Sequence, residues 1–198
     1  MTSTPPDASA AGLAALAHTA CLGLGSNLGD SLQILHTAWN LLQDEASIRA
    51  DRLSAPYRSD PLGMQSAHRF VNAAALVQTD LTPLALLARL QRIETRCGRT
   101  RPAHGAAGYR DRTLDLDLLL YDDLVLRTAE LILPHPRLHK RLFVLEPLAE
   151  IAPEWVHPLR GRTVADLRRD LLLADPDQRV ERIRWPFPPV PGAAPAPV

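Results

Sequence analysis

The 198-residue chain has 22 basic and 22 acidic residues, a formal net charge of zero, and 46% hydrophobic residues. This composition is typical of one folded domain with a substantial core, and it argues against nucleic acid or a membrane surface as a partner. There is no apolar run of transmembrane length and no cationic signal-peptide start, so we expect a cytoplasmic enzyme or binding protein.

In chain order, the first part of the sequence predicts a leader and then alternating strands and helices. Residues 1–17 are Ala-rich and weakly patterned, and we expect them to be disordered. Ser26, Asn27 and Asp30 are suited to the start of the first helix, and Thr82 to the start of the second. The predicted elements are a strand at 19–25, a helix at 31–45, strands at 47–59 and 70–80, a helix at 82–98, and a strand within 112–123.

The second part of the sequence predicts a small hairpin at 124–133, a helix over 142–151 and a last helix from Thr163. The Pro-rich residues 176–198 are expected to form a solvated tail, although their PxxP spacing would also suit a partner domain. The predicted domain therefore spans residues 18–175.

The order of the central elements, β-α-β-β-α-β, is that of the ferredoxin-like α+β sandwich, with an antiparallel sheet and extra C-terminal helices. We expect the helices to cover one face of the sheet. The other face is then free to carry polar groups.

The predicted strand "RTLDLDLLLYDD" (112–123) carries two acidic residues on one face. Leu114, Leu116, Leu118 and Leu120 alternate on the opposite face. Asp is rare in strands, and Asp115 and Asp117 at i and i+2 point the same way, roughly 6.5–7 Å apart. At an effective dielectric near 20 their repulsion is on the order of 2.5 kcal/mol.

A solvent-exposed strand face would explain either aspartate alone, but the pair indicates a nearby positive charge. The preceding Gly-containing loop supplies four arginines, which are Arg99, Arg101, Arg110 and Arg112. Lys140 is the only lysine in the chain, so phosphate binding must come from guanidinium groups or backbone amides. Carboxylates, Mg²⁺ and arginines together are typical of a nucleoside triphosphate site. A metal-dependent nuclease or a sugar-nucleotide transferase fits nearly as well.

Other segments narrow the type of site. The glycines of "GLGSNLG" (23–29) do not have dinucleotide-binding spacing, and we interpret them as a tight strand-to-helix turn. A Walker P-loop is excluded because its lysine is missing. Phe70 and Asn72 share one face of a strand, which suits a flat heterocycle that stacks and pairs along its edge. His135, between two prolines, is placed to donate to a phosphate.

Six segments together resemble the 6-hydroxymethyl-7,8-dihydropterin pyrophosphokinase family of folate biosynthesis. They are "GLGSNLGD", "RSDPLGMQSAHRFVNAA", "LQRIETRCGRTR", "RTLDLDLLLYDD", "LPHPRLHKRLFVLEPLAEIAP" and "HPLRGRTVADL", in order from Thr19 to Leu172. The resemblance implies a ferredoxin-like fold. It also implies transfer of the β,γ-diphosphate of ATP to the pterin hydroxymethyl group, with release of AMP.

The resemblance also implies roles for individual residues. Asp115 and Asp117 resemble ligands of two Mg²⁺ ions, and Arg99 and Arg112 resemble catalytic-loop arginines. The positions similar to ATP contacts are Gln91, Glu94, Arg101, Leu118, His135 and Arg141. Those similar to the pterin pocket are Ser59, Asp60, Leu62, Phe70, Asn72, Tyr109 and Phe143, where Tyr109 stands for the family's loop Trp.

We further expect a monomeric enzyme, and a monofunctional one because the sequence shows no neighbouring aldolase or synthase domain. Because Arg99 and Arg112 flank the Gly-containing loop, we expect this loop to close over ATP. An RNA-binding ferredoxin-like module is the alternative from another class. It would need aromatic central strands and net positive charge, whereas the chain has 5% aromatic residues and zero net charge.

Overall fold

The computed structural model describes residues 17–63, 66–100 and 110–187. The first elements are β1 (His18–Ser26), α1 (Ser31–Gln43), β2 (Ile48–Leu53), β3 (Tyr57–Ser59), β4 (Phe70–Thr79), α2 (Pro83–Arg96) and β5 (Asp115–Tyr121). The later ones are β6 (Leu126–Arg127), β7 (Ile132–Leu133), a 3-10 turn (Leu138–Lys140), α3 (Leu142–Ile151), β8 (Val156–His157), β9 (Arg162–Thr163), α4 (Val164–Ala174) and β10 (Val180–Arg182). In this part of the chain no helix combines the length and apolarity needed to cross a bilayer.

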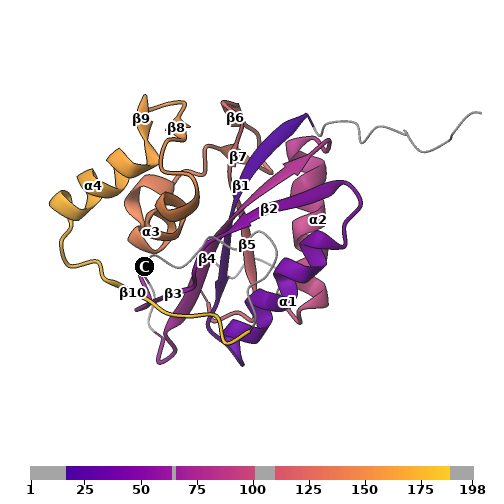
Figure 1. The fold of residues 1–198 in the computed structure, drawn as a ribbon, viewed down its shortest axis with the longest axis horizontal. Coiled ribbons are helices and arrows are strands. Elements are labelled where there is room, and N and C mark those ends of the chain that lie inside the picture. The colour runs from indigo at the N-terminus through magenta and orange to yellow at the C-terminus, as the bar shows by residue number, and fades with distance from the viewer. Residues whose placement is uncertain (1–16, 64–65, 101–109, 188–198) are drawn as a thin grey trace, which may run out of the picture.

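The central sheet confirms the predicted ferredoxin-like fold. Its strand order is β10-β3-β4-β1-β5, with β2 also paired to β4, and every pairing is antiparallel. The strand predicted over 47–59 is therefore two strands, β2 and β3, which lie one after the other along β4. Helices α1 and α2 lie together on one side of this sheet (Figure 1).

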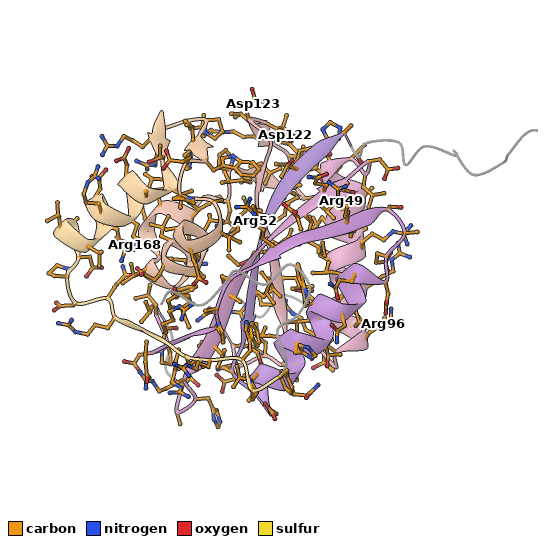
Figure 2. The ribbon with its side chains drawn as sticks, viewed as in Figure 1. Arg49, Arg52, Arg96, Asp122, Asp123 and Arg168 are labelled. Atoms are coloured by element: carbon orange, nitrogen blue, oxygen red, sulfur yellow. The ribbon has the colours of Figure 1, made fainter. Side chains whose placement is uncertain are left out.

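The break between β2 and β3 has a local cause in residues 54–56. Pro56 has no N–H to donate, and Ser54 turns its hydroxyl to accept from the Ala74 amide at 2.9 Å. The Ala55 amide donates to the Glu150 carboxylate on α3 at 3.1 Å. Arg52, on β2, donates to the Ile151 carbonyl at 3.2 Å (Figure 2). Hydrogen bonds therefore link the chain at this break between β2 and β3 to α3.

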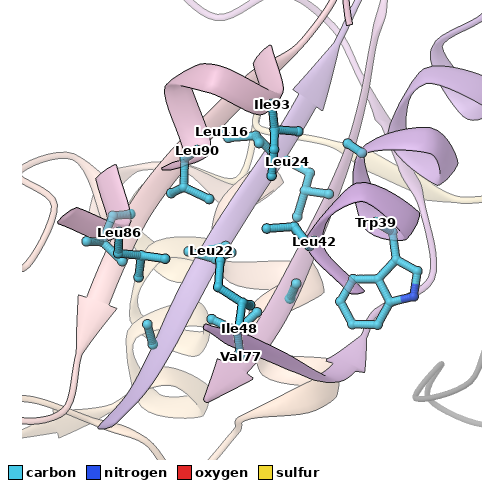
Figure 3. Packing of buried hydrophobic residues seen from close by; sticks show 14 of the residues in the cluster. Leu22, Leu24, Trp39, Leu42, Ile48, Val77, Leu86, Leu90, Ile93 and Leu116 are labelled. Carbon is cyan, nitrogen blue, oxygen red and sulfur yellow. The ribbon is translucent and has the colours of Figure 1, made fainter. Parts of the chain in front are cut away.

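The main core lies between the sheet and helices α1 and α2. Figure 3 shows Leu22 and Leu24 of β1 facing Leu42 of α1 and Leu90 of α2. Trp39 is fully buried in the same cluster. Because these side chains alternate along β1 with period two and along the helices with period close to four, the sequence pattern locates this core correctly.

The opposite face of the sheet is not free, contrary to the prediction. Helices α3 and α4 lie on that side (Figure 1). A second buried cluster joins Cys21, Ala74 and Leu120 of the sheet to Leu145 of α3 and Leu167 of α4. Polar groups are therefore confined to the part of this face that α3 leaves open.

A bulge in β5 also corrects the predicted leucine face. Leu118 pairs with Leu22 and Leu120 with Cys21, so Leu119 is an extra residue in the strand. Leu116 and Leu118 point toward α1 and α2, but Leu120 belongs to the second cluster on the other face. A one-residue insertion reverses which face each following side chain meets. The carbonyl of Leu119 accepts from the His135 amide at 2.8 Å.

The N-terminus of α1 confirms only one of its three predicted capping residues. The Asp30 carboxylate accepts from the Gln33 amide at 3.1 Å. Gly29, immediately before it, has a φ of +72°, a conformation that favours glycine. Ser26 instead donates to the Ser31 hydroxyl, and Asn27 bonds to residues 111 and 112.

Substituting Asp30→Ala is expected to lower the free energy of unfolding by about 1 kcal/mol, because it removes this cap. Urea denaturation measures the change. Asp123→Ala, at an exposed aspartate after β5, is the matched control and is expected to have a smaller effect. Equal losses in the two variants would contradict the capping role.

Part of the segment expected to be a tail lies on the domain. β10 pairs with β3, and Phe187 stacks on His36 of α1 with ring centroids 4.4 Å apart. The run "RVERIRW" (179–185) within the predicted tail lacks proline and alternates like a strand. This pattern could have predicted β10. Residues 1–16 of the expected leader (1–17) and the last residues, 188–198, lie outside the described residues.

Candidate active site

A pocket opens on the part of the sheet that α3 leaves uncovered. It has about 680 Å³ of empty space, including its open mouth. Its floor is formed by β1, β4 and β5, and its sides by β3 with the loop after it and by the start of α3. The lining residues are Gly23, Leu24, Gly25, Ser59, Asp60, Leu62, Phe70, Asn72, Ala73, Ala74, Arg112, Asp115, Asp117, Leu119, Arg141, Phe143 and Val144.

The pocket contains most residues that the sequence assigned to a site. They are the aspartate pair Asp115 and Asp117, the arginines Arg112 and Arg141, and the predicted pterin residues Ser59, Asp60, Leu62, Phe70, Asn72 and Phe143. These residues come from four separate segments of the chain. The antiparallel sheet brings them together because β3, β4, β1 and β5 are consecutive neighbours.

Two glycines of the central strand leave the floor of the pocket open. Gly25 pairs with Asn72 on one side and with Asp115 on the other, and Gly23 pairs with Asp117. A Cβ at Gly25 would lie 3.3 Å from the Asn72 side-chain oxygen. The prediction of a tight turn over 23–29 therefore holds only for residues 27–29, after β1 ends at Ser26. Gly23 and Gly25 lie within a regular strand and provide space.

Asp115 is held by two arginines. Arg112 donates to one of its carboxylate oxygens at 2.7 Å, and Arg99 donates to the other. The same Arg99 nitrogen also donates to Glu94 and, at 3.2 Å, to the carbonyl of Leu114. Arg99 and Arg112 are thus positioned beside the aspartate pair, as the loop composition suggested.

Glu94 is a buried carboxylate behind the pocket wall, with only 2% of its surface exposed. It accepts from the backbone amide of Leu116, between the two aspartates, at 2.8 Å. Together with its ion pair to Arg99, this ties the end of α2 to the start of β5. The predicted ATP contact of Glu94 stays a prediction, whereas the structure shows it supporting both Arg99 and β5.

Asp117 differs from Asp115 in its electrostatic environment. Burial, and then the nearby charge of Asp115, raise the pKa of Asp117 to about 7, while Arg141 and Arg112 act in the opposite direction. Asp115 is therefore paired with arginine, whereas Asp117 is ionised less readily than an ordinary aspartate when no ligand is present. This confirms the electrostatic conflict inferred from the strand.

Asn27 is a structural support of the site that the sequence analysis assigned to helix capping. It is buried, donates to Asp111 at 2.7 Å, and accepts from the Arg112 amide at 2.8 Å. Its own amide donates to the Arg112 carbonyl at 3.2 Å. These contacts fix the backbone that carries Arg112. The sequence signal for this supporting role was the position of Asn27 directly after a predicted apolar strand.

The aromatic side of the pocket contains an amide and a hydroxyl group. Asn72 is buried and donates to the Ser59 hydroxyl at 3.0 Å, so its side-chain oxygen remains on the Gly25 side. The Arg112 guanidinium lies 5.9 Å from the centre of the Phe70 ring, and that of Arg141 lies 5.4 Å from the Phe143 ring. Aromatic rings, an amide and cations therefore meet in one cavity.

The remaining predicted residues do not line this pocket as far as the structure describes it. Leu118 is buried in the main core, and Gln91 lies on α2. His135 accepts from the Arg137 amide at 3.2 Å, and burial and then Arg141 lower its pKa to about 4, so it is neutral near pH 7. Arg101 and Tyr109 lie outside the described residues.

The aspartate pair fits a hard divalent cation only in part. Carboxylate oxygens are suitable ligands for Mg²⁺, which usually takes one or two of them together with phosphate oxygens and water. Within the described residues there is no group of three or more His, Cys, Asp or Glu side chains that could hold a metal ion. A metal here would therefore depend on oxygens supplied by a bound ligand.

Fold and pocket together define a class: a ferredoxin-like α+β domain whose antiparallel sheet carries a small-molecule site with paired carboxylates, arginines and aromatic rings. Residues 21–153 match the model of the 7,8-dihydro-6-hydroxymethylpterin-pyrophosphokinase family. The chain therefore belongs to this family.

Curated relatives and solved structures agree with this family assignment. The chain is 42% identical over 135 residues to the 2-amino-4-hydroxy-6-hydroxymethyldihydropteridine pyrophosphokinase of Bacillus subtilis, covering 68% of this chain and 78% of the relative. It is 40% identical over 164 residues to the protein of the same name from Methylorubrum extorquens, covering 82% and 98%.

A solved structure of Plasmodium falciparum HPPK-DHPS is similar in fold, with a TM-score of 0.63 at 15% identity, over 79% of this chain. The chain spans only 44% of that protein's length.

Proposed function

We propose that the protein transfers the β,γ-diphosphate of ATP to the hydroxymethyl group of 6-hydroxymethyl-7,8-dihydropterin and releases AMP, a step of folate biosynthesis. The observation that carries the proposal is that one pocket of a family member combines the aspartate pair with arginines and with an aromatic and amide wall. A monomeric state and a cytoplasmic location are part of the proposal.

In this proposal the two ends of the pocket have different ligands. The pterin ring lies against Phe70 and Phe143, and Asn72 and Ser59 pair with its polar edge. Phosphate oxygens lie near Arg112 and Arg141, with Arg99 behind them. The side chains of Asp60 and Leu62 close the outer side. Gln91, Glu94, Arg101, Leu118 and His135 remain proposed for the ATP side, and Tyr109 for the pterin side.

The protein contributes chiefly position and charge to such a reaction. Holding the pterin hydroxymethyl oxygen in line with the β-phosphorus turns a reaction between two molecules into one within a single complex. Guanidinium groups stabilise the negative charge that moves onto the phosphate oxygens. Two Mg²⁺ ions, held by Asp115 and Asp117 and by phosphate oxygens, would supply further neutralisation of the triphosphate.

The test is to incubate the full chain with Mg²⁺, ATP and 6-hydroxymethyl-7,8-dihydropterin, and to identify the nucleotide product. AMP is expected only when the dihydropterin is present. ADP as the product would indicate a simple kinase instead. Cleavage of nucleic acid without ATP would indicate a metal-dependent nuclease. No AMP from folded protein would overturn the proposal.

A further inference from the structure

The segment that follows α4 returns to the sheet beside the pocket. β10 pairs with β3, with Val180 opposite Ser59 and Arg182 opposite Tyr57. Directly after β10, the Ile183 amide donates to the Pro56 carbonyl at 2.9 Å. The match to the family model ends at residue 153, so it does not include this segment.

β3, the strand that pairs with β10, forms one wall of the pocket. β3 is only three residues long, and it ends at Ser59, next to Asp60. Both residues line the pocket, and the Ser59 hydroxyl accepts from Asn72. On its other edge β3 pairs with β4 through these same three residues. A strand this short has few hydrogen bonds of its own, so a second neighbour matters for its position.

Two side chains of the segment form hydrogen bonds with groups around β3. Arg182 donates to Glu150 on α3 at 3.3 Å, and Glu150 also accepts from the Tyr57 hydroxyl at 2.7 Å. The Trp185 indole donates to the Ser54 carbonyl at 3.1 Å, and its ring packs against the main core. The segment thus connects the β3 wall to α3 and to the core at the same time.

A further ion-pair chain leads from β10 to the loop after β3. Glu181 lies 3.0 Å from Arg58 and 3.9 Å from Arg69, and Arg69 pairs with Asp60 at 2.8 Å. These groups are largely exposed to solvent, so each pair contributes little. The backbone pairing, Arg182 and Trp185 therefore carry the argument.

We propose that residues 180–185 are a positioning segment for the pterin side of the pocket. They fix β3, and with it Ser59 and its partner Asn72, without touching the substrate. The proposal rests on the proposed function for the identity of the ligand. It predicts an effect on pterin binding that is larger than the effect on ATP or on the chemical step.

Two shortened chains test the proposal. A chain ending at Phe187 removes only the last residues and is the matched control, with kinetics expected to equal those of the full chain. A chain ending at Arg179 removes β10 and Trp185 but keeps Gln178, which bonds to the backbone of Lys140 and Leu142 beside the pocket. Its KM for the dihydropterin is expected to rise about 10-fold or more, with KM for ATP within about twofold and kcat within about threefold. An unchanged KM for the dihydropterin would overturn the proposal. So would changes of similar size in both KM values and in kcat.

A point variant keeps the test decisive if the shorter chain does not fold. Arg182→Ala removes the link to Glu150, and Arg184→Ala, at an exposed neighbour on the same segment, is its control. Arg182→Ala is expected to raise the KM for the dihydropterin about three- to fivefold, with kcat unchanged. Equal constants for the two variants would overturn the proposal.

Hydrogen exchange tests the positioning role of residues 180–185 independently of the proposed function. Without any ligand, the β3 amides are expected to exchange faster in the Arg182→Ala protein than in Arg184→Ala, while those of α2 exchange at the same rate. If the full chain forms no AMP, the proposed function fails, and the exchange rates still decide whether the segment holds this wall. Equal exchange of β3 in both variants would overturn its positioning role.

Discussion

Replacing Asp117 with asparagine is expected to abolish diphosphate transfer and, at the same time, to stabilise the ligand-free protein at neutral pH. In the proposed mechanism Asp117 holds Mg²⁺ against the triphosphate, and an amide is a much poorer ligand. Turnover is expected to fall by a factor on the order of 10³. Steady-state AMP formation measures this loss. Asp123→Asn, at the exposed aspartate after β5, is the control and is expected to retain full activity (Figure 2).

The expected gain in stability follows from the raised pKa of Asp117. Burial and Asp115 raise it to about 7, so the folded protein favours the protonated carboxyl, whereas an unfolded Asp ionises near pH 4. The stability that this group contributes is therefore present below about pH 4 and is lost as the pH rises through about 7.

Urea denaturation in the presence of a chelator, at pH 5 and pH 8, measures this contribution. The wild-type protein is expected to lose on the order of 1–3 kcal/mol more between the two pH values than the Asp117→Asn protein. An identical pH dependence of stability in both proteins would show that folding does not raise the pKa of Asp117. Near-normal turnover in the variant would remove its proposed metal role.

Replacing Arg99 with alanine is expected to damage both the fold and the reaction. Arg99 pairs with Asp115 and with Glu94, whose exposure is only 2%. Without this guanidinium the buried carboxylate of Glu94 loses its ion pair with Arg99, at a cost of about 3 kcal/mol. The loss of charge beside the triphosphate is expected to lower kcat by a factor on the order of 10².

A double variant separates these two effects. Glu94→Gln in the Arg99→Ala background removes the stranded charge, so stability is expected to recover by about half while turnover stays low. Arg96→Ala, at the exposed last residue of α2, is the control for both measurements (Figure 2). A double variant that regains turnover, or one that gains no stability, would contradict the assigned role of Arg99.

Sequence patterns were sufficient for the order of the central elements, although they missed β10 and the division between β2 and β3. Short apolar runs marked β1 and β4, and alternating leucines marked β5. Thr82 and Thr163 are observed as the caps of α2 and α4. These signals are local, since they depend on the period of the side chains and on the residues at a helix end. The βαββαβ order then left few ways to pair the strands, and the ferredoxin-like order is the one observed.

Patterns were insufficient where a single residue changes the register. The extra residue Leu119 sends Leu120 to the opposite face, and nothing in a run of three leucines shows where a bulge lies. The break at 54–56 is stabilised by Glu150, almost a hundred residues further along the chain. The bulge has no local signal in its own segment. At 54–56 Pro56 is a local signal, but the contact with Glu150 forms only when α3 packs against the sheet.

The sequence by itself determined the chemistry of this protein: two aspartates facing one way on a strand, an arginine-bearing loop before them, and an aromatic and amide face on another strand. Only the tertiary structure decided which of these groups share a cavity, that Glu94 and Asn27 hold the arginines in place, and that the segment after α4 supports the wall at Ser59. The reason is physical. Residue type and period are properties of short segments, whereas burial, pairing and the pKa of Asp117 depend on groups that meet only when distant strands and helices pack together.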